Sequence, residues 1–447
     1  MEKLCLEIIK IIFQFCRPSD QIYFKSISHS FKNSLNITDL WDIPPKYIIK
    51  LTNDVIKLHP YCQFLQARDN FRIADINCLT NLIFLDASDY CGIDQKGIQQ
   101  LSQIVTLNID HNPKINDVAH FINLTVLSSC GSSGLDQNGI LKLVQLKKLY
   151  IADNQKINDI NHLTNLTILN ATGKCGLNQN GISKLVEIRE LYISKNQKIN
   201  DVNHLANLRI LNATGKCGLN QNGISKLVEI TELYISKNPK IYDVNHLANL
   251  KILIAQDYSG LNQNGIIKLV QLKELQIDYN HKINDVNHLT NLRLLAAGGI
   301  CGLNQNGMSK LLQLTDLIIE NNKKIDHVNH LTHLTFLNAA NESGLKQNEI
   351  SQLIQLKQLN ISNNPYIHDI NHLTNLKNLC VLGTCGVGQE GISKLGQLTE
   401  LNINFNQNIN DLSHLTNLKI LTVGGQIWYY PNGNLKISST HTIKCCR

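Results

Sequence analysis

The chain has 447 residues, of which 17% are charged and 43% are hydrophobic, and its formal net charge at pH 7 is +7. Its lysines do not form a concentrated basic run with interleaved aromatic residues, so nucleic-acid binding is not predicted. No segment reaches the roughly 18 consecutive apolar residues of a membrane span, and Glu7 and Lys10 interrupt the only run that could be a signal peptide. We therefore expect an intracellular protein, cytoplasmic or nuclear, that has no membrane partner.

The first 45 residues have the spacing of short helices. Leu4, Ile8 and Ile12 recur at helical intervals, and Pro18 ends this pattern and can begin a second helix. A third helix is expected over residues 28–35, with Trp41 closing the group. The sequence thus predicts a compact three-helix module over residues 1–45.

This module resembles an F-box, through which F-box proteins bind a Skp1-type adaptor of a cullin ubiquitin ligase. The resemblance rests on the pattern LPxEIxxxIFxxL and on later SxxSxxF and LW motifs, although Cys5 and Cys16 replace the usual proline and leucine. It implies that the adaptor-binding residues are Leu4, Glu7, Ile8, Ile12, Phe13, Phe31 and Trp41. The alternative is that residues 1–45 only cap the open end of the repeats that follow.

A 42-residue period then runs from about residue 57 to residue 425 without insertion or deletion. Histidine recurs once per period at positions 120, 162, 204, 246, 288, 330, 372 and 414, and asparagine recurs at positions 70, 112, 154, 196, 238, 280, 322, 364 and 406. Each period has two halves, such as HLTNLTILNATGKCGLNQNGI (162–182) and SKLVEIRELYISKNQKINDVN (183–203). Both halves resemble the leucine-rich repeat, LxxLxLxxN/CxL, which implies stacked coils of one supersecondary unit.

Each half-period predicts one short strand, because Leu191, Tyr192 and Ile193 alternate between inward and outward positions. Strand leucines from Leu65 to Leu421 give 18 coils at alternating steps of 20 and 22 residues. The predicted fold is an α/β solenoid, a leucine-rich-repeat horseshoe with one long parallel sheet and short helical or 3₁₀ outer turns such as 179–188. Residues 46–60 are expected to form a linker or N-terminal cap, residues 61–425 the solenoid, and residues 426–447 a C-terminal cap or tail containing a closing strand.

The repeated polar residues are interpreted as structural. The ladder asparagines follow the strands and can satisfy backbone groups of a neighbouring coil, and the Asp-x-x-His motif is expected to cap an outer turn. Cysteine and serine interchange at positions 91, 133, 175, 217, 259, 301, 343 and 385, followed each time by a glycine expected at positive φ. Equivalent cysteines lie about 10 Å apart, too far for a disulfide or a shared metal ion, so no metal site is predicted.

The predicted functional surface is the concave face of the sheet, where residues flanking the strand leucines face solvent. Acidic residues of one half-period alternate there with apolar residues of the other, and three tyrosines add aromatic anchors. The predicted partner-binding residues are Tyr150, Tyr192, Tyr234, Glu190, Glu232, Glu274, Asp316 and Glu400. A target protein with basic and apolar side chains suits this surface, whereas the alternative is a solvated sheet face without a partner.

The order of the two segments, F-box first and repeats after, is similar to that of the F-box/leucine-rich-repeat family. That resemblance implies the substrate-recognition subunit of a Skp1–cullin–F-box ubiquitin ligase, with no catalytic residues and no cofactor. No phosphate-binding glycine loop, paired catalytic carboxylates or nucleophile elbow occurs in the sequence. The alternative function is a non-enzymatic leucine-rich-repeat scaffold or regulator that binds a partner protein without any ubiquitin link.

Overall fold

The computed structural model describes residues 37–41, 45–424 and 426–429. Residues 1–36 of the predicted three-helix module therefore lie outside the described residues. The chain divides into two units, Met1–Leu227 and Val228–Arg447, and each is a solenoid built from stacked parallel strands. Among the described residues, no helix combines the length and the apolar character needed to cross a bilayer.

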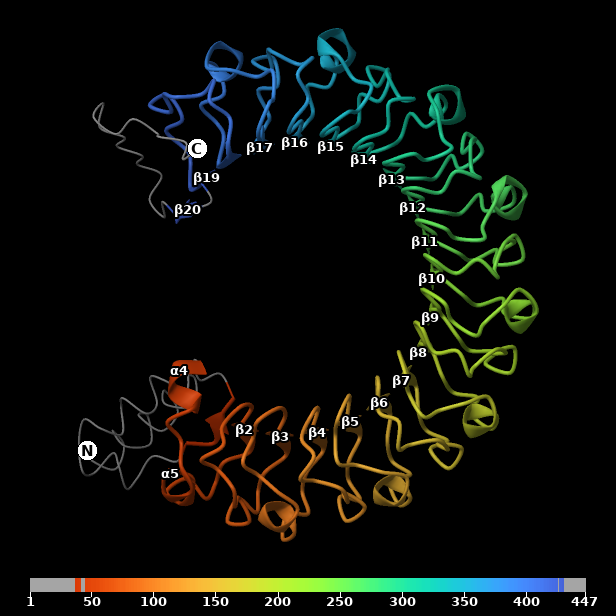
Figure 1. Cartoon of the computed structure of the whole chain (residues 1–447), viewed down its shortest axis with the longest axis vertical. Coiled ribbons are helices and arrows are strands. Elements are labelled where there is room, and N and C mark those ends of the chain that lie inside the picture. The colour runs from red at the N-terminus through yellow and green to blue at the C-terminus, as the bar shows by residue number, and fades with distance from the viewer. Residues whose placement is uncertain (1–36, 42–44, 425, 430–447) are drawn as a thin grey trace, which may run out of the picture. The chain divides into compact units, whose positions relative to one another are not determined.

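Each unit has three-residue strands along one side (Figure 1). The strands of the first unit are β1 (Asp39–Leu40), β2 (Phe64–Gln66), β3 (Phe84–Asp86), β4 (Thr106–Asn108), β5 (Val126–Ser128), β6 (Lys148–Tyr150), β7 (Ile168–Asn170), β8 (Glu190–Tyr192) and β9 (Ile210–Asn212). Those of the second unit are β10 (Glu232–Tyr234), β11 (Ile252–Ile254), β12 (Glu274–Gln276), β13 (Leu294–Ala296), β14 (Asp316–Ile318), β15 (Phe336–Asn338), β16 (Gln358–Asn360), β17 (Asn378–Cys380), β18 (Glu400–Asn402), β19 (Ile420–Val423) and β20 (Gln426–Tyr429).

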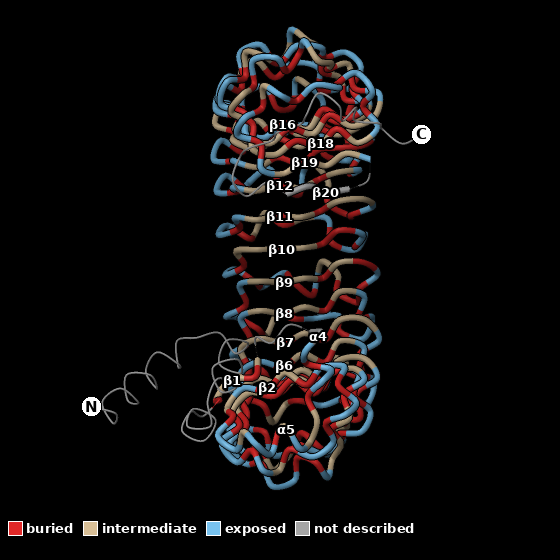
Figure 2. Tube along the Cα trace, turned by 90° about the vertical axis from the view of Figure 1, so that its left-hand side faces the viewer, coloured by how far each residue is buried: buried red, intermediate tan, exposed pale blue. Residues whose placement is uncertain are grey.

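The strand leucines lie in register within each unit, as the sequence predicts. Leu169 pairs with Leu191 and Leu191 with Leu211, and each of these side chains is buried. The residues on either side of the leucine are only partly buried, because successive strand side chains point to opposite faces. In Figure 2 much of the tube along β10 and β11 accordingly has the colour of intermediate burial. Counted from β2 to β19, the 18 predicted strands are all present.

Short 3₁₀ turns lie opposite the strands, on the outer side of each unit (Figure 1). They are η1 (Lys96–Ile98), η2 (Asn138–Ile140), η3 (Asn180–Ile182), η4 (Asn222–Ile224), η5 (Gln263–Ile266), η6 (Asn306–Met308), η7 (Gln347–Ile350) and η8 (Glu390–Ile392). One turn occurs in every 42 residues. This confirms the expected short outer turns and narrows the predicted range 179–188 to Asn180–Ile182.

The ladder asparagines hold neighbouring coils together, as predicted. Nδ2 of Asn112 donates to the carbonyl oxygens of Ala87 (2.7 Å) and Ile93 (3.1 Å) in the preceding coil. Its Oδ1 accepts from the backbone N–H of Lys114, two residues later in its own coil. The side chain is fully buried, so these bonds satisfy backbone groups that water cannot reach.

A glutamine ladder that the sequence interpretation did not identify has a similar role on the outer side. Oε1 of Gln179 accepts from the backbone N–H groups of Asn200 (3.0 Å) and Asp201 (2.9 Å) in the next coil. Its Nε2 donates to the carbonyl oxygen of Asp201 at 2.7 Å. Gln95, Gln137, Gln263, Gln347 and Gln389 make the equivalent three bonds. Both ladders replace backbone hydrogen bonds that coils of this length cannot make internally.

As expected, the aspartate of the Asp-x-x-His motif caps a short turn, although no helix follows it and the histidine has a separate role. Oδ1 of Asp159 accepts from the backbone N–H of Asn161, two residues later, which closes a local turn outside any helix. The ring nitrogen Nε2 of His162 lies 3.0 Å from the carbonyl oxygen of Ile140 in the preceding coil. The histidine ladder therefore links coils, because its period matches the spacing between equivalent carbonyl groups.

The prediction of positive φ at the glycines after the cysteine or serine row is wrong. The left-handed residues lie three positions earlier, at Gly173 for example, and in the other half-periods at non-glycine residues such as Lys195 (φ 60°). At Gly176 a Cβ atom would lie 2.4–2.7 Å from two carbonyl oxygens of the preceding coil. Glycine is present there because the coils approach closely.

The N-terminal end of the first unit includes residues assigned by sequence to the helical module and the linker. Strand β1 pairs in parallel with β2, and Leu40 is fully buried. Helices α4 (Pro45–Ile48) and α5 (Asn53–Lys57) follow. Asn70 Nδ2 donates to the carbonyl oxygens of Ile48 and Leu51, so residues 48–66 act as a coil of the solenoid. The solenoid therefore begins before the predicted residue 61.

At the C-terminal end of the second unit, the described residues include the closing strand that the sequence predicts. Strand β20 pairs with β19 and is antiparallel to it, with Leu421 opposite Trp428. The remainder of the predicted tail, residues 430–447, lies outside the described residues. This antiparallel strand covers the hydrogen-bonding edge of β19, which a further coil would otherwise occupy.

The cysteine row is buried and is expected to react slowly. Burial raises the pKa of Cys91 to about 12 and those of Cys175 and Cys301 to about 11. Because the thiolate is the reactive form, alkylation of these residues by iodoacetamide at pH 8 should be at least about 100-fold slower than at an exposed cysteine. Peptide mapping of the native protein measures this, with the exposed Cys78 as the internal reference. Rapid labelling of Cys175 would show that the coils open in solution.

Candidate partner-binding face

Two rows of side chains cover the strand face of each unit. The leading row is formed by the residue before each strand leucine, and the trailing row by the residue after it. In the second unit the leading row reads Glu232, Ile252, Glu274, Leu294, Asp316, Phe336, Gln358, Asn378, Glu400 and Ile420, each paired in register with the next. The predicted alternation of acidic and apolar residues is therefore present from β10 to β15. Amides replace it on β16 and β17, and an acidic and an apolar residue follow on β18 and β19.

In the first unit the alternation is weaker. Its leading row includes Lys148, Ile168, Glu190 and Ile210 in register, so it contains one predicted acid. The trailing row places Tyr150 and Tyr192 on either side of Asn170. The phenol of Tyr192 donates to Oε2 of Glu190 at 3.1 Å. Two predicted anchors and one predicted acid thus lie close together on β6 and β8.

The same tyrosine–glutamate pair recurs in the second unit. Tyr234 Oη donates to Oε2 of Glu232 at 3.0 Å. Burial, followed by the hydrogen bond and negative charge of Glu232, raises the pKa of Tyr234 to about 12. The phenol is therefore neutral at physiological pH and keeps the proton that it donates to Glu232.

The other predicted acids also receive hydrogen bonds from neutral side chains. Glu274 accepts from Gln276 Nε2 at 2.7 Å, Asp316 from Thr315 Oγ1 at 2.6 Å, and Glu400 from Asn378 Nδ2 at 2.8 Å. Within the part of the chain that is described, none of the five predicted acids forms an ion pair. Their negative charges are therefore oriented but not neutralised, and they are spread over β8, β10, β12, β14 and β18.

Of the predicted adaptor-binding residues, only Trp41 is described. Its ring packs edge-on against Phe84 of the leading row, with ring centroids 4.0 Å apart. The backbone N–H of Trp41 also donates to Oδ1 of Asp39 at 2.7 Å. Trp41 therefore contacts the solenoid, whereas Leu4, Glu7, Ile8, Ile12, Phe13 and Phe31 lie outside the described residues.

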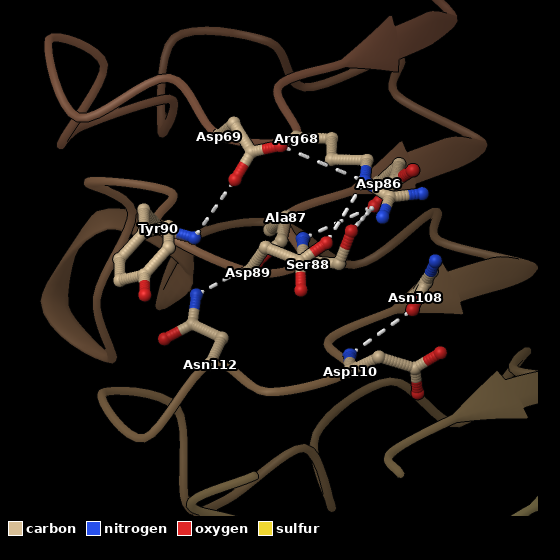
Figure 3. Close-up of polar contacts among 10 residues, drawn as sticks. All are labelled: Arg68, Asp69, Asp86, Ala87, Ser88, Asp89, Tyr90, Asn108, Asp110 and Asn112. Atoms are coloured by element: carbon tan, nitrogen blue, oxygen red, sulfur yellow. Dashed lines mark hydrogen bonds and ion pairs between the residues drawn. The ribbon is translucent and has the colours of Figure 1, made fainter. Parts of the chain in front are cut away.

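A cluster of carboxylates that the sequence interpretation missed lies where β3 and β4 end (Figure 3). Asp86 is 5% exposed and accepts from Ser88 Oγ at 2.6 Å, and burial raises the pKa of its carboxyl group. Arg68 Nε lies 2.8 Å from Asp89 Oδ2, and Asp110 accepts from the backbone N–H of Cys130. These local donors account for the cluster. No group of three or more His, Cys, Asp or Glu residues in the described ranges could hold a metal ion.

A shallow hollow on the strand face of the second unit was also missed. It has a volume of about 250 Å³ and lies over β15 to β19. Its polar lining comes from the leading and trailing rows, and Glu400 is the one predicted site residue among them. The alternation of side chains indicated which residues face outward, but the hollow depends on their sizes in adjacent strands.

Comparison with known proteins identifies the fold and not the family. No protein-family model and no curated protein matches the chain. A solved TLR13–ssRNA13 complex is similar at a TM-score of 0.53 and 20% identity, over 87% of this chain and 65% of that chain.

Two bacterial structures are also similar. The functional domain of InlJ from Listeria monocytogenes, which includes a cysteine ladder, has a TM-score of 0.43 and 18% identity over 81% of this chain and 72% of that chain. The LRR protein LIC12759 from Leptospira interrogans has a TM-score of 0.38 and 20% identity, over 77% of this chain and 84% of that chain. The repeat motif and the stacked parallel strands, together with the similarity to the TLR13 structure, show that the units of this chain have a leucine-rich-repeat fold.

Proposed function

We propose that this chain is a non-enzymatic scaffold that binds a target protein through its strand face. The observation that carries the proposal is the row of partly exposed Glu232, Glu274 and Asp316, which alternates in register with Ile252 and Leu294. Carboxylates without cationic partners and apolar side chains between them suit a protein surface with basic and apolar residues. The same charges repel a phosphate backbone, which disfavours nucleic acid as the partner.

A finer proposal is that the chain is the substrate receptor of a Skp1–cullin–F-box ubiquitin ligase. Its support is the F-box-like pattern of residues 1–45, including Leu4, Glu7, Ile8 and Phe13. In this arrangement the N-terminal segment binds the adaptor and the solenoid binds the protein to be ubiquitinated. The chain itself supplies position rather than chemistry.

The alternative is a scaffold without a ubiquitin link, and one contact favours it. Trp41, which the F-box resemblance assigns to the adaptor side, packs against Phe84 of the solenoid. Asp39–Leu40 is likewise a strand of the solenoid sheet. The end of the F-box-like segment therefore also has a structural role as an end cap.

Adaptor binding separates the two functions. Deletion of residues 1–36 leaves β1 and Trp41 in place, whereas deletion of residues 1–45 would also remove the buried Leu40. We expect the full chain to retain a purified Skp1-type adaptor in a pull-down and the 1–36 deletion to lose it. The substitution Ile8→Asp should have the same effect because it places a charge in the predicted apolar surface.

The matched control is Ile354→Asp, at a side chain that is 51% exposed on a coil far along the sequence. It should leave adaptor binding unchanged. If the full chain does not retain the adaptor, or the 1–36 deletion retains it equally well, the ligase function is wrong. Binding of a target protein by the strand face would be unaffected by that result.

A further inference from the structure

The hollow over β15 to β19 is the most distinctive part of the strand face of the second unit. It is lined by residues of five strands, from Phe336 on β15 to Ile420 and Thr422 on β19. Its volume of about 250 Å³ is below the roughly 300–1,000 Å³ of sites for drug-sized ligands. A single long side chain from a partner matches this size better than a free small molecule does.

Short side chains of the trailing row leave space over four consecutive strands at the hollow. From β16 to β19 that row has only Asn360, Cys380, Asn402 and Thr422, whereas Tyr234, Ile254 and Ile318 are among its larger members on earlier strands, which also include the small Ala296. The leading row is apolar at both ends of the hollow, at Phe336 and Ile420, and polar between them. An occupant therefore meets apolar walls at the ends and hydrogen-bonding groups in the middle.

The charge of the hollow is a single carboxylate. Glu400 is the only acidic or basic side chain of its lining apart from the thiol of Cys380, whose pKa is raised by burial. Asn378 Nδ2 donates to Oε2 of Glu400 at 2.8 Å and orients the group. The other oxygen, Oε1, accepts no hydrogen bond from a described residue, and Glu400 has no cationic partner among them.

We propose that this hollow binds an arginine side chain of the target protein. The inference deepens the proposed protein-binding function and rests on it. A guanidinium group is planar and has five N–H donors, so it can pair with Glu400 while also donating to the amide oxygens of Gln358 and Asn378. Its methylene stem can pack against Ile420, which pairs in register with Glu400. A lysine ammonium has neither the planar shape nor enough donors to use all these groups.

The test uses three small probes with the full-length protein: N-acetyl-arginine amide, N-acetyl-lysine amide and N-acetyl-citrulline amide. Citrulline has nearly the shape of arginine but no charge. We expect ligand-observed NMR titration to show saturable binding of the arginine probe, with affinity at least about fivefold higher than for lysine or citrulline. Equal affinity for citrulline would overturn the role of charge, and equal affinity for lysine would overturn the guanidinium assignment.

Variants locate the binding. Glu400→Gln should abolish the preference for arginine over citrulline, because it removes the carboxylate and keeps the shape of the side chain. Glu274→Gln is the matched control, since Glu274 lies on the same row but does not line the hollow. Circular dichroism confirms that both variants fold. An unchanged arginine preference in Glu400→Gln, or no binding of the arginine probe to the unmodified chain, would refute this inference without affecting the adaptor pull-down.

Discussion

Replacing Asn112 with alanine is expected to lower the free energy of unfolding by about 3–6 kcal/mol. The substitution removes bonds to the carbonyl oxygens of Ala87 and Ile93 and to the backbone N–H of Lys114. Asn112 is fully buried, so water does not replace these partners in an intact coil. Two buried carbonyl oxygens and the partly buried N–H of Lys114 are then left without this partner, at about 1–3 kcal/mol each before relaxation. Urea denaturation followed by circular dichroism measures the effect.

Asn165→Ala is the control for this experiment. Asn165 is exposed, and its Nδ2 makes one bond across coils, to the carbonyl oxygen of Val144 at 3.0 Å. Its loss should change the free energy of unfolding by less than about 0.5 kcal/mol, because water can take its place. Asn112→Asp should be as harmful as Asn112→Ala, since a carboxylate keeps the acceptor but cannot donate to two carbonyl groups. If both Asn112 variants were as stable as Asn165→Ala, the ladder would not hold the coils together.

Replacing Gly181 with alanine is the second large expected effect, at about 2–4 kcal/mol. A Cβ atom at Gly181 would overlap the carbonyl oxygen of Asn158 in the preceding coil. The coils would have to separate, which would weaken the 2.9 Å bond from the N–H of Ile160 to the carbonyl oxygen of Gly181. The same glycine recurs in most periods, so the effect should be similar at Gly223. Thermal and urea unfolding of the single variants measure it.

The chain contains its own comparison for this prediction, because Glu349 occupies the equivalent position in one period. Val328 and Glu349 are both described, but the N–H of Val328 does not donate to the carbonyl oxygen of Glu349. The equivalent bond is formed in other periods, for example from Ile160 to Gly181. His330 Nε2 is also buried there without a hydrogen-bond partner. Glu349→Gly should therefore raise the free energy of unfolding by about 1 kcal/mol, the value of a typical hydrogen bond. In the present chain Nδ1 of His327 contacts Oε2 of Glu349. A loss of stability in Glu349→Gly would show that this contact stabilises the fold more than the restored bond between coils does.

The part of the fold that depends on the hydrophobic period was predictable from the sequence. Leu191, Leu211 and their equivalents are buried strand centres because a strand has only two faces, and aliphatic residues that recur at steps of 20 and 22 must occupy the inner one. The asparagine ladder was predictable for a similar reason. A polar side chain repeated once per coil among buried aliphatic residues must find backbone partners.

The candidate site was predictable only in part. Alternation along β10 to β15 indicated which acids and tyrosines face outward, and the pairs in register have that order. It did not indicate that Tyr234 and Glu232 bond to each other or that Trp41 contacts Phe84. It also did not reveal the hollow at Glu400, because a hollow depends on the combined sizes of side chains from five strands.

The sequence by itself therefore determined the period, the strand centres, the parallel stacking and which strand side chains face outward, because all of these follow from one repeated pattern within a single coil. Tertiary structure alone decided why Gly176 must be glycine, where the chain adopts positive φ, and which carbonyl groups His162 and Gln179 reach. These features depend on the distance and rotation between one coil and the next, and a pattern of residue types within a coil does not contain that geometry.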